Sequence, residues 1–110
     1  MSRDKLHPPA LEKFLHEVNK KYSERIDKVI LFGSYARGDY TQESDIDLLV
    51  VWKGKLLEGW EDLENIAADI LVEYGVVISL KIVSPEEYKA MIDLQMPFIQ
   101  TLEREGVVFG

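Results

Sequence analysis

Residues 29–51 read VILFGSYARGDYTQESDIDLLVV and contain two apolar runs that are joined by a polar loop. The apolar run at residues 29–32 predicts a buried strand, which ends at Gly33. A polar loop follows, and a second apolar stretch then carries Asp45 and Asp47 two positions apart. Because residues i and i+2 of a strand point to the same face, the two carboxylates are expected side by side, with the residue between them turned toward the core.

The residue types of this stretch favour a phosphate site next to a metal site. Two neighbouring carboxylates repel each other unless a cation or protons lie between them. Mg²⁺ prefers oxygen ligands and is usually held by one or two carboxylates together with substrate phosphates, so Asp45 and Asp47 are candidate ligands. Gly33 permits a close approach of the backbone to a ligand, and Ser34 offers an N–H group and a hydroxyl to phosphate oxygens. A short helix starting at Ser34 would present further N–H groups to the same anion.

The order of these features is similar to the signature of a known superfamily. Gly33-Ser34, ten intervening residues and Asp45-Ile46-Asp47 resemble the motif of the DNA polymerase beta-like nucleotidyltransferases. The short chain resembles the minimal, antitoxin-type branch, whose members are found beside HEPN-type proteins. The likeness is specific because both strands and both halves of the motif occur in the right order. A hairpin with surface aspartates is the plain alternative, and it leaves the apolar flanks of the paired acids unexplained.

The resemblance implies a fold, an activity and a partner. The implied fold is α/β (α+β), with a small mixed β-sheet and helices packed mainly on one face. The implied activity is Mg²⁺-dependent transfer of a nucleoside monophosphate, AMP from ATP, to a hydroxyl acceptor, with Asp45 and Asp47 as catalytic residues and metal ligands. In small members of this branch the acceptor can be a tyrosine of a HEPN-type toxin, so a helical partner protein is expected. The residues expected to contact the nucleoside triphosphate are Gly33, Ser34, Arg37 and Lys81.

One position departs from the superfamily's pattern. These enzymes typically use three carboxylates, the third from a strand beside the Asp-x-Asp strand. The corresponding polar face of residues 76–83 carries Ser79 and Lys81 instead. Lys81 would partly neutralise the aspartates, and it either replaces a cation or contacts the triphosphate. Activation of the acceptor hydroxyl would then fall to a water, to a carboxylate of a partner protein, or to Asp39 or Glu43.

The missing acid keeps a second class of function open, a nucleotide-binding or partner-binding module that has lost catalysis. Transfer to a small molecule such as an antibiotic would ordinarily require an additional substrate-binding domain, which 110 residues are too few to supply. Arg37 also has two interpretations, because its guanidinium can reach a phosphate or pair with Asp39 or Glu43. The sequence leaves homo-oligomerisation open.

Length and composition exclude or disfavour several classes of protein function. The 110 residues have the size of one domain, and no second domain is expected. The formal net charge of −7 disfavours extended binding to nucleic acid, which depends on Lys and Arg contacts with phosphates. No apolar run is long enough to span a bilayer and no signal-peptide core is found, so a cytoplasmic protein without membrane contact is expected. The absence of cysteine excludes disulfides and thiolate zinc sites.

Hydrophobic periodicity and turn residues predict the other elements. An amphipathic helix is expected from the Pro8-Pro9 pair onward, and the two histidines, His7 and His16, are expected on the surface or in that helix. Residues 106–109 form either a short last strand or a docking tail. Strands are expected at residues 26–32, 45–52 and 76–83, and further helices at residues 56–74, from residue 84 through 91, and at 97–105.

Two local patterns make finer predictions about these helices. Ser84 and Glu87 have the spacing of a capping box, with Pro85 in the first turn. Trp60 is expected in the core, with a role in a base pocket as the alternative. The apolar stripe of residues 56–74 that is expected to face the core consists of Leu57, Trp60, Leu63, Ile66, Ala67, Ile70 and Leu71.

Overall fold

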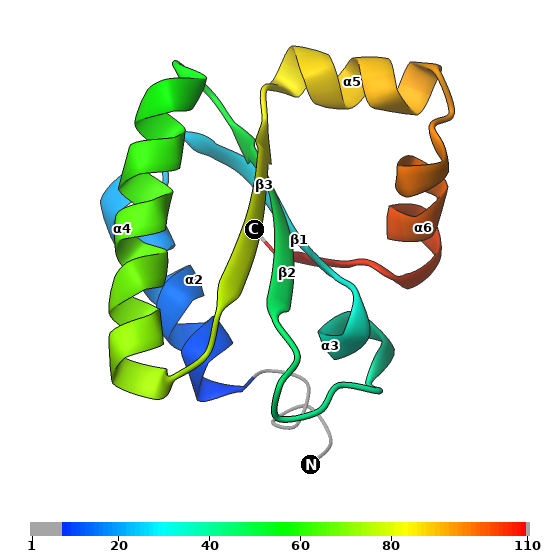
Figure 1. Cartoon of the computed structure of the whole chain (residues 1–110). Coiled ribbons are helices and arrows are strands. Elements are labelled where there is room, and N and C mark those ends of the chain that lie inside the picture. Colours follow the sequence, from blue (N-terminus) through cyan, green and yellow to red (C-terminus); the bar gives the residue numbers. More distant parts are fainter. Residues whose placement is uncertain (1–7, 110) are drawn as a thin grey trace.

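The computed structural model describes residues 8–109, in which a four-stranded mixed sheet lies between two layers of helices (Figure 1). The strand order is β3-β2-β1-β4. β2 pairs antiparallel with β1 and parallel with β3, and β4 pairs antiparallel with the other side of β1. This arrangement confirms the predicted α+β fold with a mixed sheet. The strands are β1 (Ile26–Phe32), β2 (Ile46–Trp52), β3 (Ile78–Val83) and β4 (Val107–Phe109).

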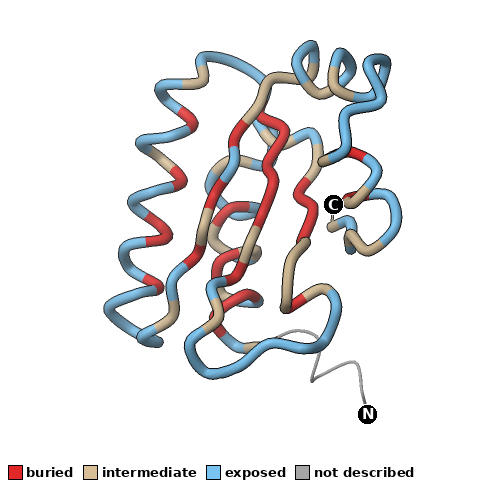
Figure 2. The backbone as a smooth tube through the Cα atoms, turned by 45° about the vertical axis from the view of Figure 1, so that its right-hand side comes forward, coloured by how far each residue is buried: buried red, intermediate tan, exposed pale blue. Residues whose placement is uncertain are grey.

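Two long helices, α2 (Pro9–Tyr22) and α4 (Leu56–Tyr74), cover one face of the sheet (Figure 1). Every second strand residue points toward them, and in β2 these residues include the fully buried Leu48 and Val50. Figure 2 shows the buried positions gathered in the strands and on the inner sides of these helices. The larger hydrophobic core therefore lies between α2, α4 and the sheet.

The other face is covered by two shorter helices, α5 (Pro85–Asp93) and α6 (Pro97–Glu105). Its core is a smaller cluster of four buried residues, to which α5 contributes none. On this face, at the beginning of β2, Asp45 is exposed and Asp47 is half-buried. The packing thus leaves polar side chains accessible at one end of the sheet. The four buried residues are Ile30, Leu49, Ile99 and Leu102.

The predicted ends of the elements agree closely with the structure. Pro9 occupies the first turn of α2, and α4 ends at Gly75, which adopts the left-handed conformation at φ 69°. The capping box of α5 is confirmed, because the Ser84 hydroxyl accepts from the Glu87 N–H and the Glu87 carboxylate accepts from the Ser84 N–H, both at 3.0 Å. Residues 107–109 form a strand, which decides between the two predictions for the C-terminal segment.

The face that α4 turns to the core differs from the predicted stripe. Trp60 is 37% exposed, so the prediction that it lies in the core is wrong. The cause is Gly59, since a Cβ on it would lie 2.8 Å from Cδ2 of Trp52. The helix therefore approaches the sheet through this glycine, and the next residue turns outward. The buried residues of α4 are Gly59, Leu63, Ile66, Ala67 and Ile70, whereas Leu57 and Leu71 are exposed.

Two further predictions concern single residues and the membrane. His16 is exposed on α2 as predicted, whereas His7 lies outside the described residues. No helix within residues 8–109 combines the length and the hydropathy that crossing a bilayer requires.

Candidate active site

The bend after β1 lies directly against the Asp47 carboxylate. Phe32 is the register partner of Asp47 across the antiparallel β1–β2 pair, and Gly33 follows with φ 75° and ψ −156°. A Cβ on Gly33 would lie 3.2 Å from Cγ of Asp47 and closer still to a carboxylate oxygen. Only glycine satisfies both the backbone conformation and this close approach. The structure thereby joins the two halves of the sequence motif.

The charge of Asp45 acts on the carboxyl group of Asp47. Asp45 is the exposed residue that immediately precedes β2, and Asp47 is the second residue of that strand. Burial raises the pKa of the Asp47 carboxyl above its ordinary value, and the negative charge of Asp45 raises this pKa further. A cation placed between the two carboxylates would relieve this repulsion.

A one-turn helix, α3 (Ser34–Arg37), begins at the bend. The Arg37 N–H donates to the carbonyl of Gly33 at 3.0 Å, so the N–H groups of residues 34–36 precede the first hydrogen bond of this helix. Gly38 ends it in the left-handed conformation, and its N–H donates to the carbonyl of Ser34 at 2.8 Å. The turn brings Ser34, which is half-buried, next to the glycine that touches Asp47.

Arg37 is held by two carboxylates near the aspartate pair. Its Nε lies 3.2 Å from Oδ2 of Asp39, and its Nη1 lies 3.2 Å from Oε1 of Glu105 at the end of α6. Both partners raise the pKa of Arg37, and the Arg37 charge in turn lowers the pKa of Asp47. Of the partners predicted from the sequence, Asp39 is paired, whereas Glu43 forms no ion pair with Arg37 in the described part of the chain.

Lys81 and Ser79 lie on the same face of the sheet as Asp47. In the parallel β2–β3 register, Asp47 faces Ser79 and Leu49 faces Lys81. The exposed Lys81 places its Nζ 5.8 Å from the ring centroid of Phe98 in α6, and its charge lowers the pKa of Asp47. The strand beside the aspartates therefore supplies a hydroxyl and an ammonium group at the polar positions of this face.

Sequence reasoning missed two residues of α6 that shape this face, Phe98 and Glu105. The Phe98 ring meets the Phe32 ring edge-on, with centroids 5.2 Å apart. Phe32 is itself the register partner of Asp47 across the β1–β2 pair. Glu105 is separated from Arg37 by 68 positions in the sequence. A usable signal existed, because residues 98, 102 and 105 have the i, i+4, i+7 spacing of one helix face.

The carboxylates at this site fit a divalent ion that is bound partly by the protein and partly by a substrate. They do not fit an ion whose ligands all come from the protein. Within residues 8–109 no three His, Cys, Asp or Glu side chains form a group that would hold a metal ion. The carboxylates of Asp45 and Asp47 nevertheless supply oxygen donors of the kind that Mg²⁺ uses together with phosphate oxygens. Phosphates of a bound nucleotide would have to complete the coordination.

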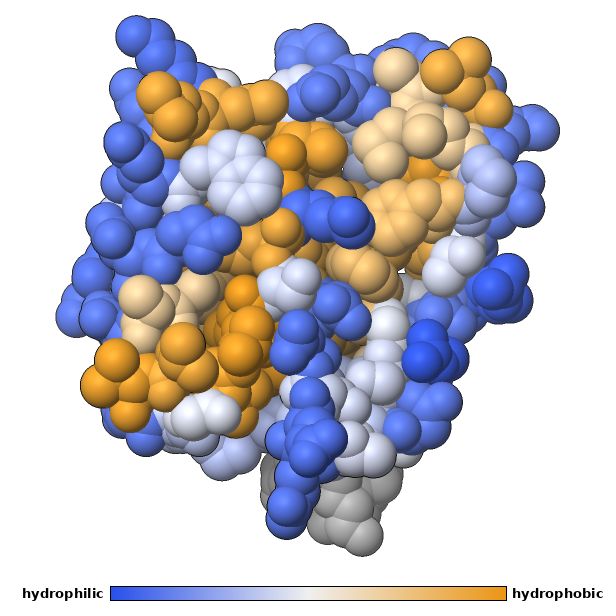
Figure 3. Space-filling model, viewed as in Figure 1, coloured by the Kyte–Doolittle hydropathy of each residue, from blue (hydrophilic) through white to orange (hydrophobic). Residues whose placement is uncertain are grey.

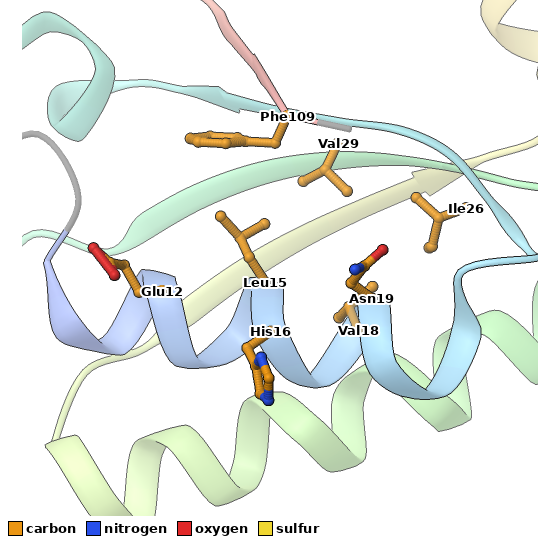
Figure 4. Close-up of a pocket in the computed structure, with 8 residues that line it drawn as sticks. All are labelled: Glu12, Leu15, His16, Val18, Asn19, Ile26, Val29 and Phe109. Atoms are coloured by element: carbon orange, nitrogen blue, oxygen red, sulfur yellow. The ribbon is translucent and has the colours of Figure 1, made fainter.

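A groove of 530 Å³ lies elsewhere, between α2 and the β1–β4 edge of the sheet (Figure 4). Leu15 points from α2 toward Phe109 and Val29 across this groove, whereas His16 points away from the sheet. The groove is on the face covered by α2 and α4, opposite to the face that carries Asp47. It is therefore separate from the candidate active site.

The family of the chain follows from comparison with known proteins. Residues 11–99 match the family model described as "Nucleotidyltransferase domain". The chain belongs to this family. The motif, the bend and the paired aspartates described above thus lie within a nucleotidyltransferase domain. The activity of this family is nucleotidyl transfer.

Curated relatives support the same class. A Methanocaldococcus jannaschii protein named as a candidate protein adenylyltransferase, MJ0604, is 43% identical over 84 residues, which cover 76% of this chain and 80% of that protein. A second M. jannaschii protein with the same kind of name, MJ0141, is 36% identical over 98 residues, covering 88% of this chain and 92% of the relative.

Solved structures share the fold at low sequence identity. A candidate nucleotidyltransferase from Sulfolobus solfataricus aligns with a TM-score of 0.58 at 21% identity, covering 91% of this chain and 76% of that chain. A toxin–antitoxin structure with AMP-PNP aligns with a TM-score of 0.53 at 19% identity, covering 88% and 70% of the two chains. These likenesses confirm the fold.

Proposed function

We propose that the protein transfers AMP from ATP to a hydroxyl group on a partner protein, with one Mg²⁺ bound between Asp45, Asp47 and the triphosphate. The observation that carries the proposal is the contact of the Asp47 carboxylate with Gly33, beside the exposed Asp45. This contact supports the proposal, because the bend at Gly33 and the carboxylate pair are close enough together for one triphosphate to reach both.

The residues around the pair have complementary tasks in this proposal. Gly33, Ser34 and the N–H groups at the beginning of α3 bind the outer phosphates, and Arg37 and Lys81 offset the remaining negative charge. The acceptor hydroxyl attacks the α-phosphorus in line, and pyrophosphate leaves on the opposite side. A bound Mg²⁺ would supply Lewis-acid stabilisation of the phosphate charge.

The choice of ATP and of a protein acceptor is supported by the relatives. Two relatives that cover most of this chain are named as candidate protein adenylyltransferases. A structure with the same fold is that of a toxin–antitoxin with AMP-PNP. We infer that the acceptor is a HEPN-type helical protein in a toxin–antitoxin pair, and that its hydroxyl is deprotonated by a carboxylate of the partner, by water, or by Asp39 or Glu43.

One observation favours a second candidate function, a nucleotide-binding module that does not catalyse transfer. The strand beside Asp47 offers Ser79 and Lys81, and no third acidic side chain joins the pair among the described residues. In this alternative, the protein binds ATP at the same site and regulates its partner by occupancy. Binding of nucleotide without transfer distinguishes this function from the first.

The test uses ATP labelled at the α-phosphate, Mg²⁺, the full chain and a HEPN-type helical protein as the acceptor. The proposal predicts that label appears on the partner. Substitutions Asp45→Asn and Asp47→Asn should each reduce this labelling at least about 100-fold, since each removes a charged oxygen donor for the metal. The matched control is Asp27→Asn, an exposed aspartate at the other end of β1, which should label the partner normally.

One result would contradict transfer, and another would contradict the site. Absence of label with all four nucleoside triphosphates, together with calorimetric binding of AMP-PNP that depends on Asp47, would establish the binding module instead. Labelling that survives both aspartate substitutions would place the chemistry elsewhere.

A further inference from the structure

The outer side of α4 carries a row of exposed apolar side chains beside a free edge of the sheet. Leu57, Trp60, Leu71 and Tyr74 are 71%, 37%, 47% and 36% exposed, respectively. β3 is the last strand of the sheet on this side, and α4 packs against it. Figure 3 shows apolar surface over α4 and the adjoining strand, interrupted by hydrophilic side chains. We call the four residues the α4 stripe.

The α4 stripe follows a heptad pattern. Positions 57, 60, 64, 67, 71 and 74 are separated alternately by three and four residues, the spacing with which one helix packs along another. Within this row Ala67 is buried in the core, and the other five positions are the ones that a docked helix would contact. The flank of α4 that faces α2 is a different one, because Ile66, Asp69 and Glu73 line the cavity between these two helices. The stripe thus lies on the side of α4 away from α2, where each of its four side chains keeps more than a third of its surface exposed.

The charge of α4 determines what can cover the stripe. The helix sequence LLEGWEDLENIAADILVEY contains acidic residues and no Lys, Arg or His. Glu64 lies within the heptad row itself, between Trp60 and Leu71. A second copy of α4 packed on the stripe would bring acidic helices together, which is unfavourable. A partner with basic residues would gain electrostatic attraction instead.

We propose that the α4 stripe is a docking surface for an amphipathic helix of a different protein, whose apolar face is flanked by Lys and Arg. The heptad row spans residues 57–74, so the docked helix has about four to five turns. α4 lies on the face of the sheet opposite to Asp47. The partner would therefore bind without covering the nucleotide site, and this inference does not depend on the proposed function.

The test measures binding of fluorescein-labelled synthetic helices to the full chain by fluorescence anisotropy. One peptide of three heptads has Leu at positions a and d and Lys at e and g, and a second peptide has Glu at e and g. We expect binding of the Lys peptide and none of the Glu peptide. Trp60→Gln and Leu71→Gln should each weaken binding about tenfold, the usual effect of truncating a central interface anchor.

Control variants separate docking on the stripe from general attraction to an acidic protein. Val72 is 87% exposed on the same helix but lies outside the heptad row, so Val72→Gln should leave the affinity unchanged. Glu64→Gln should weaken binding and reduce its dependence on salt. Circular dichroism melting of each variant confirms that the fold is retained.

Three results would overturn the inference. The first is failure of the Lys peptide to bind the wild-type chain. The second is equal binding of both peptides, or an equal effect of Val72→Gln and Leu71→Gln. The third is a dimer of the chain in sedimentation that Leu71→Gln dissociates, because this would make a second copy the occupant.

Discussion

Gly33 is restricted both by its backbone conformation and by its contact with the candidate active site. Its positive φ is one constraint, and the adjacent Asp47 carboxylate is a second. Gly75 also has a positive φ, of 69°, but a Cβ there would meet nothing within 4 Å. Substitutions at the two glycines can therefore separate two contributions to the free energy of unfolding. One is the backbone strain of a positive φ, and the other is the steric contact with Asp47.

We expect Gly33→Ala to destabilise the fold by about 2–4 kcal/mol, because the left-handed strain and a steric clash add. Gly75→Ala should cost only about 1 kcal/mol, from the strain alone. Urea unfolding measures both values, and partner labelling should be lost in Gly33→Ala and retained in Gly75→Ala. Equal unfolding energies for the two variants would show that Asp47 does not restrict position 33.

The pKa of Asp47 predicts how stability depends on pH. Burial and Asp45 raise this pKa in the folded state, so the folded protein binds a proton that the unfolded chain releases at the same pH. Above the raised pKa, the charged Asp47 therefore reduces stability. Asp47→Asn should increase the melting temperature at pH 7 by about a few degrees, and this gain should shrink as the pH falls toward the ordinary carboxyl value of about 3.9.

Thermal melts of the wild type and of Asp47→Asn between pH 7 and pH 4 check this dependence, with Asp27→Asn as a control for the loss of one charge. A gain that grows toward low pH would have the wrong sign. Addition of Mg²⁺ with AMP-PNP should reverse the order at pH 7, because only the wild type gains stability from the bound ion.

The sequence predicted the candidate site at this scale through local spacing. Gly33, Asp45 and Asp47 lie within one short stretch, and strand alternation alone orients the two acids. Phe98 and Glu105 were missed because the helix face that residues 98, 102 and 105 share does not by itself specify where α6 packs on the sheet. Their positions depend on how the last helix docks on the sheet.

Among the elements, α3 and α6 are tied to each other across the site by the Arg37–Glu105 pair. In the proposed function Arg37 also binds phosphate, so Glu105 and the nucleotide compete for the same guanidinium. We expect Glu105→Gln to strengthen AMP-PNP binding about twofold, and Arg37→Met to weaken it about tenfold. Isothermal titration calorimetry gives both affinities.

The matched control for this pair is Glu103→Gln, an exposed glutamate on the same helix that makes no ion pair with Arg37 in the described part of the chain. It should leave the affinity unchanged. If Arg37→Met binds AMP-PNP as the wild type does, the guanidinium serves only to join α3 to α6.

Helix and strand boundaries were predictable where turn residues mark them. Ser84, Pro85 and Glu87 specified the beginning of α5, and Gly75 specified the end of α4. The inward face of α4 was not predictable, because periodicity alone favours Trp60 over its small neighbour. Only the proximity of Trp52 makes Gly59 the residue that faces the sheet.

For the molecule as a whole, the two faces of the sheet differ in how much hydrophobic core they carry. The face under α2 and α4 holds the larger core, and the opposite face combines a small core with the polar site. Stability should therefore depend mainly on the first face. The fully buried Leu63 belongs to the large cluster, whereas Met91 is partly buried against the small one.

We expect Leu63→Ala to reduce the free energy of unfolding by about 3 kcal/mol and Met91→Ala by about 1 kcal/mol, since cavity cost depends on how completely a side chain is enclosed. Urea unfolding at neutral pH measures both values. A larger loss for Met91→Ala would show that the α5–α6 layer is the principal source of stability.

The position of β2 has a consequence for motion. This strand carries Asp47 and is hydrogen-bonded on both sides, to β1 and to β3, whereas Gly33 and α3 follow the end of β1 in a connecting turn. Amide hydrogens in the middle of β2 should consequently exchange with deuterated solvent only when the entire sheet opens, and those of α3 should exchange through small local fluctuations. The Asp47 carboxylate would then keep its position on the rigid strand, and the backbone of α3 would move locally when the phosphates bind.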